Sequence, residues 1–170
     1  MLSKIVKLKD LVQKISTLRV SGRTIVFTNG CFDILHVGHV RYLAAARSEG
    51  DVLVVGLNSD ESARSIKQED RPIVSQDQRA EVLAGLECVD YITVFNEPDP
   101  LKLIQALKPD VLVKGADWKE EDIIGADVVK AGGGKVVRVD VVPDISTSRI
   151  IQRIVKRHQH MGGKGLWSEY

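Results

Sequence analysis

A strand, a glycine-containing turn and a helix follow one another near the start of the chain, and this order constrains the fold most. The apolar strand is predicted over 23–28, the helix over 38–48, and a second apolar strand over 51–57. Two strands joined by a helix form a βαβ unit, in which the strands are parallel and the crossover is almost always right-handed. The carboxyl ends of both strands therefore lie at one edge of a sheet, which is where open α/β folds bind their ligands.

The alternation of helical and apolar segments continues along the chain. Apolar residues at helical spacing predict an amphipathic helix over 7–19 that packs on the sheet. The other predicted elements are a short helix after residue 59 with a loop as far as 75, a helix from 75, strands over 90–95, 110–113 and 135–141, helices over 100–107 and 120–131, and a helix starting at 146–148. The pattern predicts a single-domain, Rossmann-like α/β fold over 1–157, with a doubly wound parallel five-stranded sheet, and a loose tail over 158–170.

Length, charge and cysteine content exclude several classes of protein. The 170 residues, 44% of them hydrophobic, suffice for one domain with a substantial core. The 24 Lys and Arg against 23 Asp and Glu leave no broad basic field, so we expect no nucleic-acid partner. Cys31 and Cys88 show neither a C-x-x-C spacing nor a disulfide-dense pattern, and no run reaches the length of a membrane span. We therefore expect a cytoplasmic protein without a membrane partner.

Two histidines open the first predicted crossover helix. His36 and His39 are three residues apart and so lie on one face of the first helical turn, while Gly38 leaves room for a ligand between them. Unpaired N–H groups and the helix dipole favour an anion at that end, so the pattern predicts a phosphate site. Two other interpretations stay open. One is a zinc site, for which no third ligand is arranged nearby, and the other is a pair of surface histidines, which leaves Asn29 and Asp33 of the turn unexplained.

The segment around these histidines resembles a known family signature. Gly30 to His39 is similar to the Gly-x-Phe-Asp-x-x-His-x-Gly-His signature of the cytidylyltransferase-like nucleotidyltransferases. Class I aminoacyl-tRNA synthetases carry a related His-x-Gly-His, but this chain is too short for one. Five segments, in the same order over roughly residues 20–157, resemble the heptose-1-phosphate adenylyltransferase domain of bacterial ADP-heptose synthases. They are 28–39, Asn58-Ser59-Asp60, Arg71-Pro72, 113–118 and Ser146-Thr147-Ser148.

The resemblance implies roles for residues in and around these segments. The implied catalytic residues are His36, His39 and Lys67. The implied nucleotide-binding residues are Thr28, Asn29, Gly30, Cys31, Phe32, Gly38, Arg79, Lys114, Gly115, Asp117, Ser146 and Thr147. The implied sugar-phosphate ligands are Asp33, Asn58, Asp60 and Arg71. Many family members carry Arg-Thr-Glu-Gly before the Ile-Ser-Thr motif, whereas this chain has Val142-Pro143-Asp144, which weakens the case for a glycerol- or choline-phosphate enzyme.

The resemblance also implies a reaction. The chain would transfer AMP from ATP to D-glycero-D-manno-heptose 1-phosphate, giving ADP-heptose and pyrophosphate for lipopolysaccharide or a related surface glycan. Mg²⁺ would bridge triphosphate oxygens without direct protein ligands. A separate sugar kinase and a homodimer or larger homo-oligomer are the expected partners. The alternatives are a cytidylyltransferase for a phosphorylated polyol or alcohol, a nucleotide-binding regulatory module that has lost catalysis, and an interaction subunit.

Overall fold

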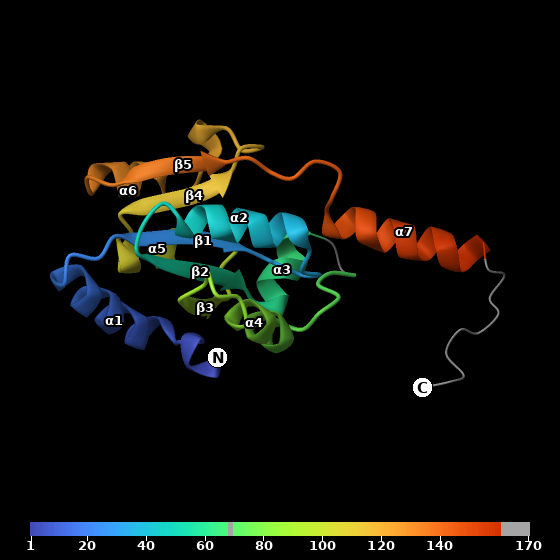
Figure 1. Ribbon diagram of the computed structural model, residues 1–170, viewed down its shortest axis with the longest axis horizontal. Coiled ribbons are helices and arrows are strands. Elements are labelled where there is room, and N and C mark those ends of the chain that lie inside the picture. Colours follow the sequence, from blue (N-terminus) through green and yellow to red (C-terminus); the bar gives the residue numbers. More distant parts are fainter. Residues whose placement is uncertain (68–69, 161–170) are drawn as a thin grey trace.

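A parallel sheet forms the centre of the molecule, for which the computed structural model describes residues 1–67 and 70–160. The sheet has five strands in the order β3-β2-β1-β4-β5 (Figure 1). The strands are β1 (Ile25–Gly30), β2 (Val52–Asn58), β3 (Tyr91–Phe95), β4 (Val111–Gly115) and β5 (Lys135–Val139). Every neighbouring pair is parallel, so the prediction of a Rossmann-like, doubly wound α/β fold is confirmed.

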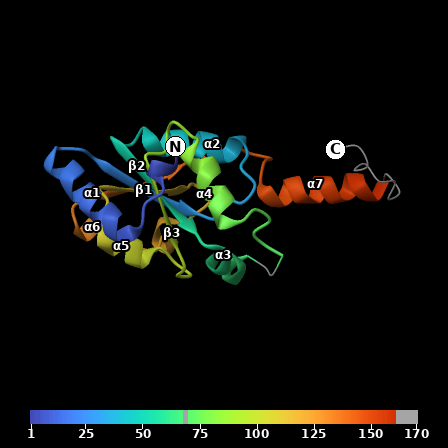
Figure 2. The same cartoon turned by 90° about the horizontal axis from the view of Figure 1, so that it is seen from below.

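Helices cover both faces of this sheet (Figure 2). One face packs against α1 (Leu8–Val20), α5 (Leu101–Leu107) and α6 (Ala126–Ala131), and the other against α2 (Val37–Arg47) and α4 (Gln76–Ala84). The middle strands are therefore covered on both sides, and a strand in that position has to be apolar along its whole length. β2 fits this pattern, because all seven of its residues are buried and only the last, Asn58, carries a polar side chain. The amphipathic helix predicted over 7–19 is α1, and it packs on the sheet as expected.

The prediction of one continuous helix over 120–131 is wrong for the middle of this segment. The structure has a short 3-10 turn, η2 (Glu120–Asp122), and then α6 after a break. The break falls at Gly125, whose φ of 83° lies in the left-handed region that favours glycine. A β-carbon at this position would also lie 2.6 Å from Cδ1 of Ile104, so the backbone at Gly125 passes very close to α5. Helical spacing alone does not reveal such a contact with a distant segment.

The remaining elements are short, except for the last helix. η1 (Leu2–Lys4) and α3 (Asp60–Ile66) are single turns or little more, while α7 (Thr147–His160) extends away from the sheet in Figure 1. The loose tail predicted from residue 158 is wrong for 158–160, which continue α7. Residues 68–69 of the predicted loop and 161–170 of the predicted tail lie outside the described residues. None of the helices that the structure describes is both long and apolar enough to cross a bilayer.

β1 and β4 are paired over a shorter stretch than β1 and β2. β1 pairs with β2 at six positions, from Ile25–Val52 to Gly30–Leu57. It pairs with β4 at two positions only, Val26–Val111 and Phe27–Leu112. The chain also reverses its direction of winding here, since β2 and β3 lie on one side of β1 while β4 and β5 lie on the other. Such a topological switch point opens a crevice at the carboxyl ends of the strands, where ligands bind in this class of fold.

Candidate active site

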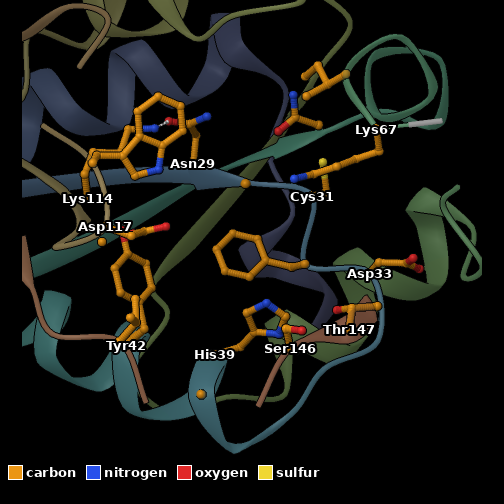
Figure 3. Close-up of a pocket in the computed structure, with 18 of the residues that line it drawn as sticks. Asn29, Cys31, Asp33, His39, Tyr42, Lys67, Lys114, Asp117, Ser146 and Thr147 are labelled. Atoms are coloured by element: carbon orange, nitrogen blue, oxygen red, sulfur yellow. Dashed lines mark hydrogen bonds between the residues drawn. The ribbon is translucent and has the colours of Figure 1, made fainter. Parts of the chain in front are cut away.

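A cavity of about 640 Å³ occupies this carboxyl edge, and Figure 3 shows the side chains around it. Its wall comes from the ends of β1, β2 and β4, the first turn of α2, the end of α3 and the segment that leads into α7. The predicted site residues that line it are Asn29, Gly30, Cys31, Phe32, Asp33, His36, Gly38, His39, Asn58, Lys67, Arg71, Lys114, Gly115, Asp117, Ser146 and Thr147. The fold thus brings together segments from both halves of the sequence, as the placement of motifs at strand ends predicts.

The two histidines of the signature stack on each other at the edge of this cavity. Their ring centroids are 3.8 Å apart with an interplanar angle of 17°, and the edge of Phe32 packs against His39. His36 occupies the N-cap position of α2. A β-carbon at Gly38 would lie 3.0 Å from the His36 ring, so only glycine allows the rings to approach in this way without displacement.

Both histidine rings are neutral and incompletely hydrogen bonded. Burial, together with the neighbouring His36, lowers the pKa of His39 to about 4, and burial also lowers the pKa of His36. Among the described residues, neither His36 Nδ1 nor His39 Nδ1 has a hydrogen-bond partner, although both atoms are buried. A buried polar atom without a partner destabilises the protein unless a water or ligand supplies one. The two rings line the cavity, so a ligand can contact them, while their Nδ1 atoms themselves are buried behind its surface.

Asp33 lines the cavity, but its carboxylate is already engaged by the segment after residue 70. Oδ2 accepts hydrogen bonds from Arg71 Nε at 2.6 Å and Ile73 N at 3.1 Å, and Oδ1 accepts one from Val74 N at 2.9 Å. Burial acts to raise the pKa of Asp33, but these hydrogen bonds outweigh it and hold the pKa below its usual value. Asp33 and Arg71 therefore bond to each other, whereas the resemblance implied that both of them bind the sugar phosphate.

Arg79, an implied phosphate ligand, does not line the cavity and is only 1% exposed. Its guanidinium donates to three separate segments: Nη1 to the carbonyl of Cys31, Nε to the carbonyl of Val74 at 2.9 Å, and Nη2 to Asp60 Oδ1 at 2.7 Å. The prediction that Arg79 contacts phosphates disagrees with this placement. Asp60, an implied sugar-phosphate ligand, also lies outside the lining, because it faces Arg79.

Lys114, on β4, is hydrogen bonded to a side chain of the neighbouring strand β1. Its Nζ donates to Asn29 Oδ1 at 2.5 Å and lies 5.6 Å from the centre of the Trp118 ring. Burial lowers the pKa of Lys114 to about 8, while the nearby Asp117 opposes that shift. This lysine therefore gives up its proton more readily than an exposed one, and an anion in the cavity would restore the charge.

The start of α7 closes the cavity on the side of the histidines. Ser146 Oγ accepts the backbone N–H of Arg149 at 3.2 Å and so caps the helix, while Thr147 Oγ1 donates to the carbonyl of Ile34 at 3.4 Å. Ile145 packs close to Gly38. Two of the three hydroxyls predicted at this helix start thus serve local structure, and they still line the cavity.

Sequence reasoning missed several lining residues. Trp118 directly follows the implied Asp117, and Tyr42 lies three residues after His39 on the same face of α2, so helical spacing could have indicated it. Thr28, an implied nucleotide ligand, is fully buried beneath the cavity and bonds to Tyr42 instead. Asp99 and Ser148 are missed polar residues of the lining, and the other missed residues form apolar walls: Ile66, Pro98, Pro100, Ile123, Ile124, Val141, Val142 and Ile145. Nothing in the periodicity of their segments marks them as site residues.

No cluster of three or more His, Cys, Asp or Glu side chains suitable for a metal ion occurs in the part of the chain that the structure describes. The carboxylate of Asp33 interacts electrostatically with His39, and the same carboxylate is bonded to Arg71. The donor set around the cavity is thus suited to anions through its lysines, imidazoles and hydroxyls.

A crevice at a switch point, a helix N-terminus and a set of anion-binding side chains define the chain as a nucleotide-binding α/β protein of the Rossmann-like class. The model of the cytidylyltransferase-like family matches residues 27–153, and the chain belongs to this family. The resemblance stated from the His-x-Gly-His signature is confirmed.

Curated relatives carry the name bifunctional protein HldE. The chain is 50% identical over 157 residues to that of Syntrophotalea carbinolica, covering 92% of this chain and 32% of the relative. It is 51% identical over 156 residues to that of Geobacter metallireducens, again covering 92% of this chain and 32% of the relative. The chain thus spans about a third of the length of the curated relatives that it matches.

Two solved structures resemble the fold. The lipopolysaccharide core biosynthesis protein from Thermoplasma volcanium matches with a TM-score of 0.58 and 31% identity, over 71% of this chain and 98% of that one. A pantoate-beta-alanine ligase from Francisella tularensis, solved with an ATP analogue and beta-alanine, matches with a TM-score of 0.58 over 98% of this chain and 81% of that one. Its identity of 18% supports the fold alone.

Proposed function

We propose that this chain transfers AMP from ATP to D-glycero-D-manno-heptose 1-phosphate, giving ADP-heptose and pyrophosphate for lipopolysaccharide or a related surface glycan. The observation that carries the proposal is the pair of stacked, neutral imidazoles at the start of α2, which line the cavity together with Lys67 and the start of α7. The identity with HldE and the solved relative named for lipopolysaccharide core biosynthesis support the substrate class. A cytoplasmic location follows from ATP as the substrate.

The proposed step needs no covalent enzyme intermediate. An anionic oxygen of the sugar 1-phosphate attacks the α-phosphorus of ATP in line, the bond from that phosphorus to the bridging oxygen breaks, and pyrophosphate leaves with the electron pair. Because the nucleophile is already ionised at neutral pH, the site needs no strong base. It has to hold two anions that repel each other and to neutralise the charge on the α-phosphoryl oxygens and on pyrophosphate.

The residues of the cavity suit those tasks. His36 and His39 donate hydrogen bonds to phosphate oxygens, since each neutral ring keeps one N–H. Lys67, at the end of α3, offsets the charge where the two phosphates meet. The start of α7 at Ser146 and Thr147 holds the β- and γ-phosphates, where the helix N-terminus favours an anion. Asn29, Gly115 and Asp117 lie at the same edge and bind the rest of the nucleotide.

Mg²⁺ is part of the proposal as a partner of ATP. No triad of metal-binding side chains occurs among the described residues, and a cation held by triphosphate oxygens needs none. When bound there, it neutralises charge on the leaving group. The source of heptose 1-phosphate is a sugar kinase, and a homodimer or larger homo-oligomer remains our prediction for the assembly.

A turnover panel tests the proposal. ATP or CTP is offered with heptose 1-phosphate, glycerol 3-phosphate or choline phosphate, with and without Mg²⁺, and pyrophosphate release is measured alongside the nucleotide product by ³¹P NMR. We expect turnover with ATP, heptose 1-phosphate and Mg²⁺ together. Preferred turnover of CTP with a polyol or alcohol phosphate would instead establish the cytidylyltransferase, and nucleotide binding without turnover on any pair would establish the regulatory module.

A further inference from the structure

The two strands that flank the cavity are joined by side chains at the level where their backbone pairing stops. The last backbone pair between β1 and β4 is Phe27–Leu112. The next level along the strands holds Thr28 and Val113, and the one after it Asn29 and Lys114, and both of these levels are bridged by side chains. By contrast, β1 and β2 stay paired through the backbone as far as Gly30.

Tyr42 makes the first of these bridges. Its hydroxyl donates to the carbonyl of Val113 at 3.1 Å and lies 2.7 Å from Thr28 Oγ1. Since the tyrosine proton is directed to the carbonyl, the threonine is the donor in the second contact. Burial raises the pKa of Tyr42 to about 12, so the hydroxyl keeps its proton at neutral pH. Thr28 is fully buried, and the bridge spans the floor of the crevice.

The pair of Lys114 and Asn29 makes the second bridge, one residue further along each strand and on the opposite face of the sheet. The Nζ to Oδ1 contact of 2.5 Å crosses from β4 to β1, and the dashed line in Figure 3 marks it. The same ammonium group lies 5.6 Å from the centre of the Trp118 ring. One end of this bridge therefore sits on the strand that leads to the histidines and the other on the strand that leads to Asp117.

We propose that Tyr42 is a positioning residue, which together with the Lys114–Asn29 bridge fixes the width of the crevice and so the distance between its histidine side and its Trp118 side. The inference rests on the proposed function, because a nucleotide triphosphate is long enough to contact both sides at once. Tyr42 lines the cavity without being needed for charge neutralisation, and its hydroxyl is fully used by the two strands. Both bridges hold β1 and β4 at a fixed separation, so either one partly compensates for loss of the other.

Calorimetry of ATP binding tests this directly, with Tyr42→Phe, Lys114→Met and the double variant. Tyr42→Phe leaves the ring in place and removes the bridge, and we expect roughly three- to tenfold weaker ATP binding, as the loss of a buried hydrogen bond predicts. In steady-state kinetics the KM for ATP rises by a similar factor, while kcat changes less than twofold. The loss on Tyr42→Phe is larger in the Lys114→Met background than in the wild type, because no second bridge remains. Tyr91→Phe, on β3 and outside the cavity lining, is the matched control and leaves ATP binding unchanged.

Several outcomes overturn the inference. A Tyr42→Phe protein that loses thermal stability but binds ATP as the wild type does shows a merely structural hydroxyl, and so do losses that simply multiply in the double variant. If Tyr42→Phe does not fold, Thr28→Val removes one of the two contacts of the bridge and is expected to weaken ATP binding by a smaller factor, and unchanged binding there refutes the proposal. Wild-type protein that binds ATP but transfers no AMP refutes the proposed reaction alone, and wild-type protein that binds no ATP refutes both.

Discussion

Two groups of charged and polar side chains lie in the wall of the cavity or behind it, and the fold uses them in opposite ways. The first, which we call the turn clamp, consists of Asp33, Asp60, Arg71 and Arg79. Its members bond to one another and to the backbone of the turn after β1 and of the segment at 73–74. The second, which we call the ligand group, consists of His36, His39 and Lys67. In the described structure its two imidazoles keep buried nitrogens without partners.

The difference teaches which charged residues near a cavity are available to a ligand. Asp33 and Arg79 of the turn clamp already have hydrogen-bond partners within the protein, so a ligand would have to break those bonds to use them. The imidazoles and the lysine of the ligand group line the cavity, and no hydrogen bond of their side chains to the described residues is found, so they are available to a ligand. Both groups come from short motifs of similar polar character, and residue type alone does not separate them.

The largest effect that we expect is on stability, when the turn clamp loses Arg79. Arg79→Met leaves the Asp60 carboxylate and two backbone carbonyls without their donor, and loss of one partner from a buried ion pair typically costs about 3–5 kcal/mol in the free energy of unfolding. Urea unfolding measures it. Arg47→Met is the control, because Arg47 pairs with Asp90 at a half-exposed site where such a pair contributes about 0–1 kcal/mol. Equal losses in the two variants would contradict the distinction between the groups.

The next effect is on catalysis, when the ligand group loses His39. If its ring donates to a phosphate in the transition state, His39→Ala should lower kcat about a hundredfold or more, as removal of a comparable donor does. Unfolding in urea should change far less than for Arg79→Met. His158→Ala, on the exposed part of α7, is the matched control and should keep full turnover. Near-normal turnover of His39→Ala would remove this residue from the mechanism.

Comparison of these two variants also shows what the sequence could predict. The alternation of segments predicted the sheet, and the signature predicted that His36 and His39 meet at a strand end, because both are local patterns. The partners of Arg79 are Cys31, Val74 and Asp60, which lie up to 48 residues away, so its use depends on the assembled fold. The same holds for Tyr42, whose hydroxyl bridges two strands that no local pattern places together.

A smaller catalytic effect is expected at Lys67. Its ammonium group lies at the cavity on the end of α3, so Lys67→Met should lower kcat/KM about tenfold or more, the scale of a charge-assisted hydrogen bond to a phosphate. Stability should be unaffected, since the side chain is exposed. Lys102→Met removes an exposed lysine that pairs with Glu97, and provides the control for a general change in charge. A loss of the same size in both variants would place Lys67 outside the ligand group.

The two groups should also differ in how pH affects stability. The pKa of His39 is lowered to about 4 in the folded protein, whereas an unfolded histidine titrates near 6.5. As the pH falls from about 6.5 to about 4, the unfolded state takes up a proton that the folded state does not, so this group lowers the free energy of unfolding across that window. Asp33 has a folded pKa below its usual value of 3.8, so the stability that it contributes is present at higher pH and is lost only as the pH falls below about 4.

Urea unfolding at pH 7, 5.5, 4.5 and 3.5 separates the two windows. His39→Asn should flatten the decline between pH 6.5 and 4 relative to the wild type, because the variant has no imidazole there to protonate. Asp33→Asn should keep that decline and extend it to lower pH, because the Asp33 charge raises the pKa of His39, while reducing stability at pH 7, where the wild-type carboxylate accepts its three hydrogen bonds. If His39→Asn keeps the full decline, the imidazole is not held neutral by its surroundings. The ligand group would then be as well satisfied by the protein as the turn clamp, and the contrast between them would no longer mark the binding site.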